Sequence, residues 1–248
     1  MKQSTTKFGV HSPFVFKCLT SCFNAKTKAE KSDIIKTYNF FLKKNKNRIH
    51  VTDYGAGSRI FKNNERRVSD IAKNAGISIK RAKILIRMVK YFNVNAILEI
   101  GTSLGMSTLA LALGNKKAKI ITLEGCSETV KIPQNELHKY VKNKIDFKIG
   151  EFGDTLPKVL ENQKYDLVYF DGNHQKEPTI TYFEQCLQTI HNDSIFIFDD
   201  IHWSKEMTEA WEYIKNHEKV KLTLDTFNWG IVFFRKEQQE KEHFIIRI

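Results

Sequence analysis

The sequence predicts an α/β protein in which a doubly wound parallel sheet follows an N-terminal helical cap. Three observations support this fold class. An apolar run at 96–100 leads into a glycine-containing turn and then an apolar helix at 107–113. From 96 onward, strand-like and helix-like segments alternate, as a doubly wound sheet requires. Residues 1–92, in contrast, show helical spacing of apolar residues and no convincing sheet.

Length and composition set the domain organisation. A chain of 248 residues with 41% hydrophobic residues can form one large domain with an added cap, which we expect at 1–92, followed by the sheet domain at 93–248. The four cysteines lack the spacing of a metal site, which favours a reduced, cytoplasmic protein. We expect neither a signal peptide nor a transmembrane segment, because no apolar run is long enough.

Charge is distributed unevenly along the chain. The formal net charge is +12, but residues 1–92 contain 21 basic and 5 acidic residues, whereas the remainder contains 19 basic and 23 acidic residues. This asymmetry indicates an anionic partner for the first third, such as a phosphorylated substrate, a nucleic acid or a membrane surface. A lysine-coated, solvated helical surface explains the same charge equally well.

The expected cap has helical periodicity at 14–23, 34–42 and 68–92. Within it, residues 69–88 resemble the helix-turn-helix of DNA-binding proteins. The second helix is rich in Ile, Leu, Met and Val and leads into the first strand. Packing of this helix against the sheet domain is therefore favoured over DNA recognition.

Two further cap motifs have competing interpretations. Residues 51–59, with Asp-Tyr-Gly-Ala-Gly-Ser-Arg, contain a glycine loop, but no strand ending in an acid follows, so we exclude them as the cofactor site. A structural turn is favoured there over an anion-binding nest at Ser58 and Arg59. His11, before Pro13, is a candidate for the acceptor pocket, although such a segment more often fixes a helix to the core.

The sheet domain is predicted to contain seven strands. After 96–100, the parallel strands are expected at 119–124, 146–150, 166–171 and 195–199. Two β-rich runs, 220–226 and 229–235, are close enough for a terminal hairpin through 228–230.

The turn after the first strand has the chemistry of a nucleotide-type site. Glu99, Gly101 and Gly105 give the spacing E-x-G-x-x-x-G, which differs from the dinucleotide fingerprint G-x-G-x-x-G. Such a turn lets a ligand approach the backbone and directs helix N-terminal amides at it. Glu124 closes the second strand, where an acid can accept both hydroxyls of a ribose.

Three carboxylates end two neighbouring strands. Asp171 follows the fourth strand, and Asp199 and Asp200 end the fifth. Oxygen ligands of this kind suit magnesium, calcium or manganese. Alternatively, one of Asp199 and Asp200 caps the following helix or binds the cofactor.

Together these motifs resemble the class I methyltransferases that use S-adenosylmethionine, and most closely their catechol O-methyltransferase-like branch. The matching order of loop, acid, Gly-Glu-Phe-Gly-Asp, Asp-Gly-Asn-His, Asp-Asp and hairpin covers residues 96–235. The resemblance implies S-adenosylmethionine as cofactor and a seven-stranded sheet ending in an antiparallel hairpin. The cofactor-binding residues would be Glu99, Gly101, Thr102, Ser103, Gly105, Ser107, Glu124, Gly125, Phe152, Gly153 and Asp171.

The resemblance also implies catalytic roles. His174 stands where the family carries a lysine that deprotonates the acceptor hydroxyl, and histidine can do the same because its ordinary pKa is about 6.5. Asp171 would be the second catalytic residue. The resemblance further implies a site for Mg²⁺ or another divalent cation at Asp171, Asp199 and Asp200. The family's metal ligands are Asp, Asp and Asn, so Asp200 departs from that pattern.

The predicted activity is therefore methylation of a hydroxyl on a small-molecule or glycan-like acceptor. His202 and Trp203 are candidates for the acceptor pocket, with an ordinary core or surface pair as the alternative. Two other functions remain open: an RNA methyltransferase that uses the basic cap, and a DNA-binding regulator through 69–88. The sequence has neither an Asn/Asp-Pro-Pro-Tyr/Phe motif nor an apparent nucleophilic cysteine, which counts against the RNA methyltransferase hypothesis.

Overall fold

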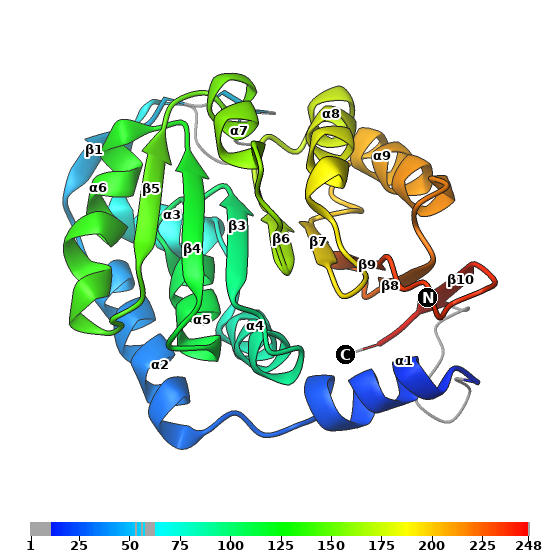
Figure 1. Cartoon of the computed structure of the whole chain (residues 1–248). Coiled ribbons are helices and arrows are strands. Elements are labelled where there is room, and N and C mark those ends of the chain that lie inside the picture. The colour runs from blue at the N-terminus through cyan, green and yellow to red at the C-terminus, as the bar shows by residue number, and fades with distance from the viewer. Residues whose placement is uncertain (1–10, 53, 56, 58–62, 248) are drawn as a thin grey trace.

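The computed structural model describes residues 11–52, 54, 55, 57 and 63–247. Within this part of the chain, eight strands form one mixed sheet in the order β10-β8-β9-β7-β6-β3-β4-β5 (Figure 1). Five of them are parallel: β3 (Ala96–Ile100), β4 (Lys119–Glu124), β5 (Ile145–Ile149), β6 (Leu167–Phe170) and β7 (Ile195–Asp199). They lie within two residues of the predicted ranges, because strands buried on both faces give nearly continuous apolar runs.

The predicted terminal hairpin is confirmed. Strand β8 (Leu222–Asp225) pairs antiparallel with β9 (Trp229–Phe233), and β9 pairs antiparallel with β7. An eighth strand, β10 (Glu242–Ile245), extends the seven predicted ones by pairing parallel with β8. Only alternate residues of this edge strand are shielded, and charged residues precede it, so its sequence has a weak strand signal.

Helices cover both faces of the sheet. One face packs against α1 (Pro13–Lys17), the π-helix η2 (Cys18–Phe23), α2 (Ala29–Lys44), α4 (Ile79–Tyr91) and α5 (Met106–Gly114). The other packs against α7 (Phe152–Leu160), α8 (Lys176–Cys186) and α9 (Lys205–Asn216). The remaining helical elements are α3 (Val68–Asn74), α6 (Ser127–Glu136) and the 3₁₀ turns η3 (Leu137–Lys139) and η4 (Leu187–Thr189). This arrangement is the predicted doubly wound fold.

The sequence predicted helices and no sheet in the N-terminal third, but the structure contains a small sheet there. Strands β1 (Arg48–His50) and β2 (Glu65–Arg67) form a small antiparallel sheet. Each has three residues and is dominated by charged or polar side chains, so neither shows the apolar alternation that identifies a strand.

The predicted packing of the second helix of 69–88 against the sheet domain is confirmed. Helix α4, the would-be recognition helix, packs closely against α5 and buries residues such as Leu85, Met88 and Val89 in the core that it shares with the sheet. In the described residues, no helix combines the length and apolar character needed to cross a membrane.

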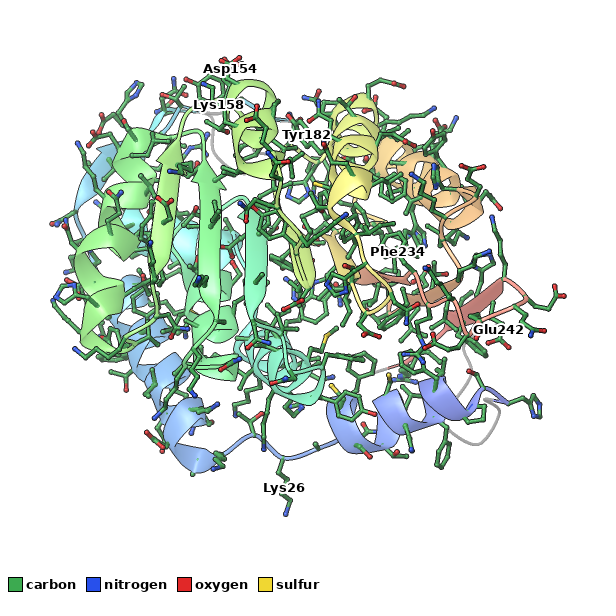
Figure 2. All side chains as sticks on the ribbon, viewed as in Figure 1. Lys26, Asp154, Lys158, Tyr182, Phe234 and Glu242 are labelled. Atoms are coloured by element: carbon green, nitrogen blue, oxygen red, sulfur yellow. The ribbon has the colours of Figure 1, made fainter. Side chains whose placement is uncertain are left out.

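The parallel strands establish where a ligand can bind. In Figure 1 the arrowheads of β3, β4 and β5 point toward the end of the molecule where α7 lies, whereas α1 lies at the opposite end. Figure 2 shows the same polarity in single residues, with Asp154 and Lys158 on α7 at one end and Lys26 at the other. In open α/β sheets, ligands bind outside the carboxyl ends of the strands.

Candidate functional site

A cavity of about 430 Å³ lies at the carboxyl ends of β3, β4, β6 and β7. Loops after these strands form its floor, and residues of the N-terminal third form part of its wall. The sequence-predicted residues that line it are Gly101, Ser103, Glu124, Gly125, Phe152, Gly153, Asp171, His174, Asp199, Asp200 and Trp203. The fold therefore brings most of the predicted site together.

The glycine loop is shaped by close contact with the strand beside it. Gly101 has a φ of +105°, and a Cβ at this position would lie 2.1 Å from the carbonyl oxygen of Asp171. Only glycine fits there. Ser103, two residues on, also has a positive φ of 47°. Gly101 therefore allows the loop to pack directly against the backbone at Asp171.

Glu124 is fixed at the cavity wall by the backbone. Its Oε2 accepts a hydrogen bond of 2.7 Å from the Ser103 N–H, and its Oε1 accepts one of 2.9 Å from the Cys126 N–H. The carboxylate is thus oriented before any ligand arrives, which suits it to accept hydroxyl groups of a ribose.

Four predicted cofactor residues do not line the cavity: Glu99, Thr102, Gly105 and Ser107. Glu99 is fully buried beneath the loop, where its Oε2 accepts hydrogen bonds from Thr108 (2.5 Å) and Thr122 (2.6 Å). Burial raises its pKa to about 7. Thr102 joins the same group through a 2.5 Å hydrogen bond to Thr122. Glu99 and Thr102 thus form a buried hydrogen-bonded group behind the loop.

An aromatic wall lies on the other side of the loop. The Phe152 ring covers Gly172, where a Cβ would come within 2.5 Å of it. Tyr182 packs edge-on against Phe152 with ring centroids 6.0 Å apart and points from α8 toward α7 (Figure 2). Tyr182 also lines the cavity, although no sequence pattern pointed to it.

Residues of the N-terminal third complete the wall. The Tyr54 ring packs on Gly125, with an ideal Cβ of Gly125 only 2.7 Å from it, and Gly55 packs equally closely on the Asn173 backbone. The segment 51–59, which the sequence excluded as the cofactor loop, therefore contributes to the same cavity. Ser58 and Arg59, its candidate anion ligands, lie outside the described residues.

The acidic end of the cavity combines a histidine with strained backbone. His174 Nε2 lies 3.7 Å from Asp171 Oδ1, and the Trp203 ring lies beside His174 with centroids 6.2 Å apart. Asn173, His174 and Asp200 all have positive φ. For residues other than glycine this conformation is costly, and it concentrates at functional sites. Burial and the nearby Asp199 and Asp200 carboxylates raise the pKa of Asp171.

Parts of this chain are similar in sequence to known methyltransferases. Residues 98–201 match a family model described as a methyltransferase domain. The chain is 26% identical over 127 residues to a catechol O-methyltransferase of Mycobacterium tuberculosis, covering 50% of this chain and 56% of that protein. It is 26% identical over 150 residues to catechol O-methyltransferase domain-containing protein 1 of Mus musculus, covering 58% of this chain and 56% of that one. Over residues 98–201, the chain is therefore similar to methyltransferase domains.

The similarity in fold extends over more of this chain than the similarity in sequence. The solved structure of the SAH-bound methyltransferase PaMTH1 of Podospora anserina superposes with a TM-score of 0.62 at 15% identity. The superposition covers 92% of this chain and 97% of PaMTH1. By sequence, in contrast, the chain spans about half the length of the curated relatives it matches.

A charged residue that the sequence did not predict also lines the cavity. Arg81, in the first turn of α4, donates a hydrogen bond of 2.5 Å from Nη1 to Asp199 Oδ1 and lies 4.0 Å from Asp200 Oδ1. Burial alone would lower the pKa of this guanidinium, but the Asp199 carboxylate outweighs it and the pKa is raised. Sequence patterns relate residues that are close in the chain. They give no signal for Arg81 and Asp199, which are 118 positions apart.

Asp171, Asp199 and Asp200 do not fit a divalent cation. Asp199 Oδ1 accepts hydrogen bonds from Arg81 and from the Asp200 N–H (2.9 Å), while Oδ2 accepts one from Tyr169 (3.2 Å). Among the residues that the structure describes, no group of three or more acidic, histidine or cysteine side chains is arranged to hold a metal ion. The predicted metal site is thus not supported.

Two predicted acceptor residues lie away from the cavity. His202 Nε2 forms a 2.8 Å hydrogen bond with Asp225 and does not line the cavity, so it packs as part of the fold. His11 is exposed just before α1. Phe14 of α1 packs on Phe233, which pairs with the first residue of β7. His11 therefore lies near the amino ends of the strands, opposite the site.

Proposed function

We propose that this chain transfers a methyl group from S-adenosylmethionine to a hydroxyl oxygen of a small-molecule acceptor. The observation that supports this function is a single cavity bounded on one side by Gly101 and Glu124 and on the other by His174 and Asp171. We assign the first side to the cofactor and the second to the proton acceptor, so that the two would face one another across one space. A volume of about 430 Å³ is typical of small-molecule sites.

The cofactor end has the residues that a nucleoside needs. Glu124, oriented by two backbone N–H groups, would accept the ribose hydroxyls. Phe152 and Gly153 would contact the adenine, with Tyr182 supporting Phe152 from behind. Gly101 lets this end of the cavity pack directly against the Asp171 backbone. The relatives named as catechol O-methyltransferases and the SAH-bound fold relative support the same cofactor.

The acceptor end would provide base catalysis. S-adenosylmethionine, when bound, would supply a sulfonium methyl group, whose carbon–sulfur bond would break as the acceptor oxygen bonds to the methyl carbon, with S-adenosylhomocysteine as the leaving group. His174 would take the proton of the acceptor hydroxyl as the oxygen–carbon bond forms. Asp171, 3.7 Å from its ring, would orient the imidazole and stabilise the cation that results. The residues act mainly by holding two reactants in line.

Calorimetric titration with S-adenosylhomocysteine tests the cofactor site. We expect one binding site per chain with micromolar affinity. Absence of binding would contradict the proposal. Incubation with S-adenosylmethionine and a panel of phenolic and aliphatic hydroxyl compounds, followed by mass spectrometry, then tests the transfer. Steep, salt-dependent retention on RNA would instead favour the nucleic-acid alternative.

A further inference from the structure

We propose that the guanidinium of Arg81 takes the place of a divalent cation at the acidic end of the cavity, so that methyl transfer in this chain needs no metal. This inference rests on the proposed function and identifies the residue that supplies positive charge at the acceptor site. It follows from the contacts of Asp199, from the position of Arg81 on α4 and from the charge of the site.

The contacts of Asp199 leave no room for a metal ion. Its side chain is 3% exposed, and each carboxylate oxygen already accepts a hydrogen bond from Arg81, Tyr169 or the backbone of Asp200. A magnesium ion would need direct oxygen contacts at about 2.1 Å. The guanidinium nitrogen, 2.5 Å from Oδ1, occupies that approach.

Arg81 is held in this position by its helix. Ser78 caps α4 by accepting a hydrogen bond from the Arg81 N–H, and the buried neighbours Ala82 and Leu85 fix the helix against the core. A basic residue in the first turn of a helix opposes the helix dipole. The attraction of Arg81 to the Asp199 and Asp200 carboxylates offsets this unfavourable interaction with the helix dipole.

The charge of the site also agrees with an internal cation. Asp171, Asp199 and Asp200 end two adjacent strands and would repel one another without a positive partner. The Arg81 side chain is 20% exposed and lines the cavity, so it neutralises Asp199 while still facing a bound acceptor. A guanidinium keeps its charge at every physiological pH and can hold an acceptor oxygen as it becomes an anion.

Manganese titration of the purified chain tests this inference. For the wild-type chain we expect no stoichiometric Mn²⁺ binding below about 1 mM, the weak limit of protein sites for hard cations. The affinity for S-adenosylhomocysteine should be the same within about twofold in EDTA and in Mg²⁺, because the site holds no metal ion that EDTA could remove. One Mn²⁺ bound by the wild type and lost in Asp199→Asn would overturn the inference.

Removal of the guanidinium should create the metal site. We expect Arg81→Gln to bind one Mn²⁺ at least about tenfold more tightly than the wild type, because three carboxylates then lack a cation. The double variant Arg81→Gln/Asp199→Asn should lose this binding. Lys90→Gln, at the exposed far end of the same helix, is the matched control and should behave as the wild type. A folded Arg81→Gln that binds no Mn²⁺ would contradict the inference.

Two readouts keep the outcomes separate. If Arg81→Gln lacks the circular dichroism of a folded chain, the wild-type titration decides by itself. If the wild type fails to bind S-adenosylhomocysteine, the proposed function fails whatever the Mn²⁺ result. If it binds S-adenosylhomocysteine and also one Mn²⁺ through Asp199, only the role of Arg81 fails.

Discussion

Arg81 and Asp199 are 118 positions apart in the sequence, yet Nη1 of one and Oδ1 of the other are 2.5 Å apart. The pair connects α4, from the N-terminal third, to the end of β7 in the sheet. It therefore ties the two parts of the chain together at the cavity itself.

Breaking this pair should destabilise the fold. We expect Arg81→Met to lower the free energy of unfolding by about 3 kcal/mol, because it leaves a buried carboxylate without its partner. Adding Asp199→Asn should recover part of the loss. Urea denaturation of the two single variants and the double variant measures the coupling. Lys36→Met, which breaks an exposed pair with Asp33, is the control and should cost less than about 1 kcal/mol. Strictly additive effects of the Arg81 and Asp199 variants would contradict the coupling.

Glu124→Gln should weaken the binding of S-adenosylhomocysteine. Loss of a charged acceptor for ribose hydroxyls corresponds to a roughly tenfold to hundredfold higher Kd. Calorimetry measures this change. Glu128→Gln, in an exposed ion pair with Lys131 on α6, should leave the Kd unchanged. Equal affinity in both variants would remove Glu124 from the cofactor site.

Gly101→Ala should be far more damaging than Gly76→Ala. Both residues have positive φ, but a Cβ at Gly101 meets the Asp171 carbonyl at 2.1 Å, whereas a Cβ at Gly76 meets nothing within 4 Å. We expect Gly76→Ala to cost about 1 kcal/mol from backbone strain alone, and Gly101→Ala to cost about 3 kcal/mol or more. Urea denaturation compares the two, and equal costs would show that close contact does not matter at Gly101.

Glu99 should make the stability depend on pH. Its pKa is about 7 in the folded chain against an ordinary value of 4.5, so the folded state holds its proton over a range in which the unfolded state has lost it. Raising the pH through this range therefore lowers the free energy of unfolding, by about 3 kcal/mol in total. In Glu99→Gln this contribution is absent. Denaturation of both chains at pH 4.5 and 7.5 checks it, and parallel profiles would show that Glu99 ionises normally.

His174→Gln should slow methyl transfer without loss of the cofactor. Removal of a general base typically lowers the rate by about 10²-fold to 10⁴-fold. The measurement is the rate of S-adenosylhomocysteine formation with the best acceptor of the panel, together with calorimetry for the cofactor. The exposed His138→Gln serves as control. Unchanged turnover in His174→Gln would exclude this histidine as the base.

Much of the fold could be predicted because its signals are local. The buried strands β3, β4 and β7 lie at the predicted residues, since apolar runs bounded by turns identify them without knowledge of their partners. The short strands β1 and β2 were missed because charged residues dominate them. The edge strand β10 was missed because its apolar residues are few.

The same distinction holds for the candidate site. The sequence by itself determined the residues that end the parallel strands, such as Gly101, Glu124 and Asp171, because the carboxyl ends of parallel strands must share one edge of the sheet. Only the tertiary structure decided which groups meet them from elsewhere in the chain. The packing of α4 on α5 brings Arg81 to Asp199, and the wall formed by Tyr54 closes on Gly125. Contacts of this kind depend on how distant elements pack, and no local spacing of residues encodes that packing.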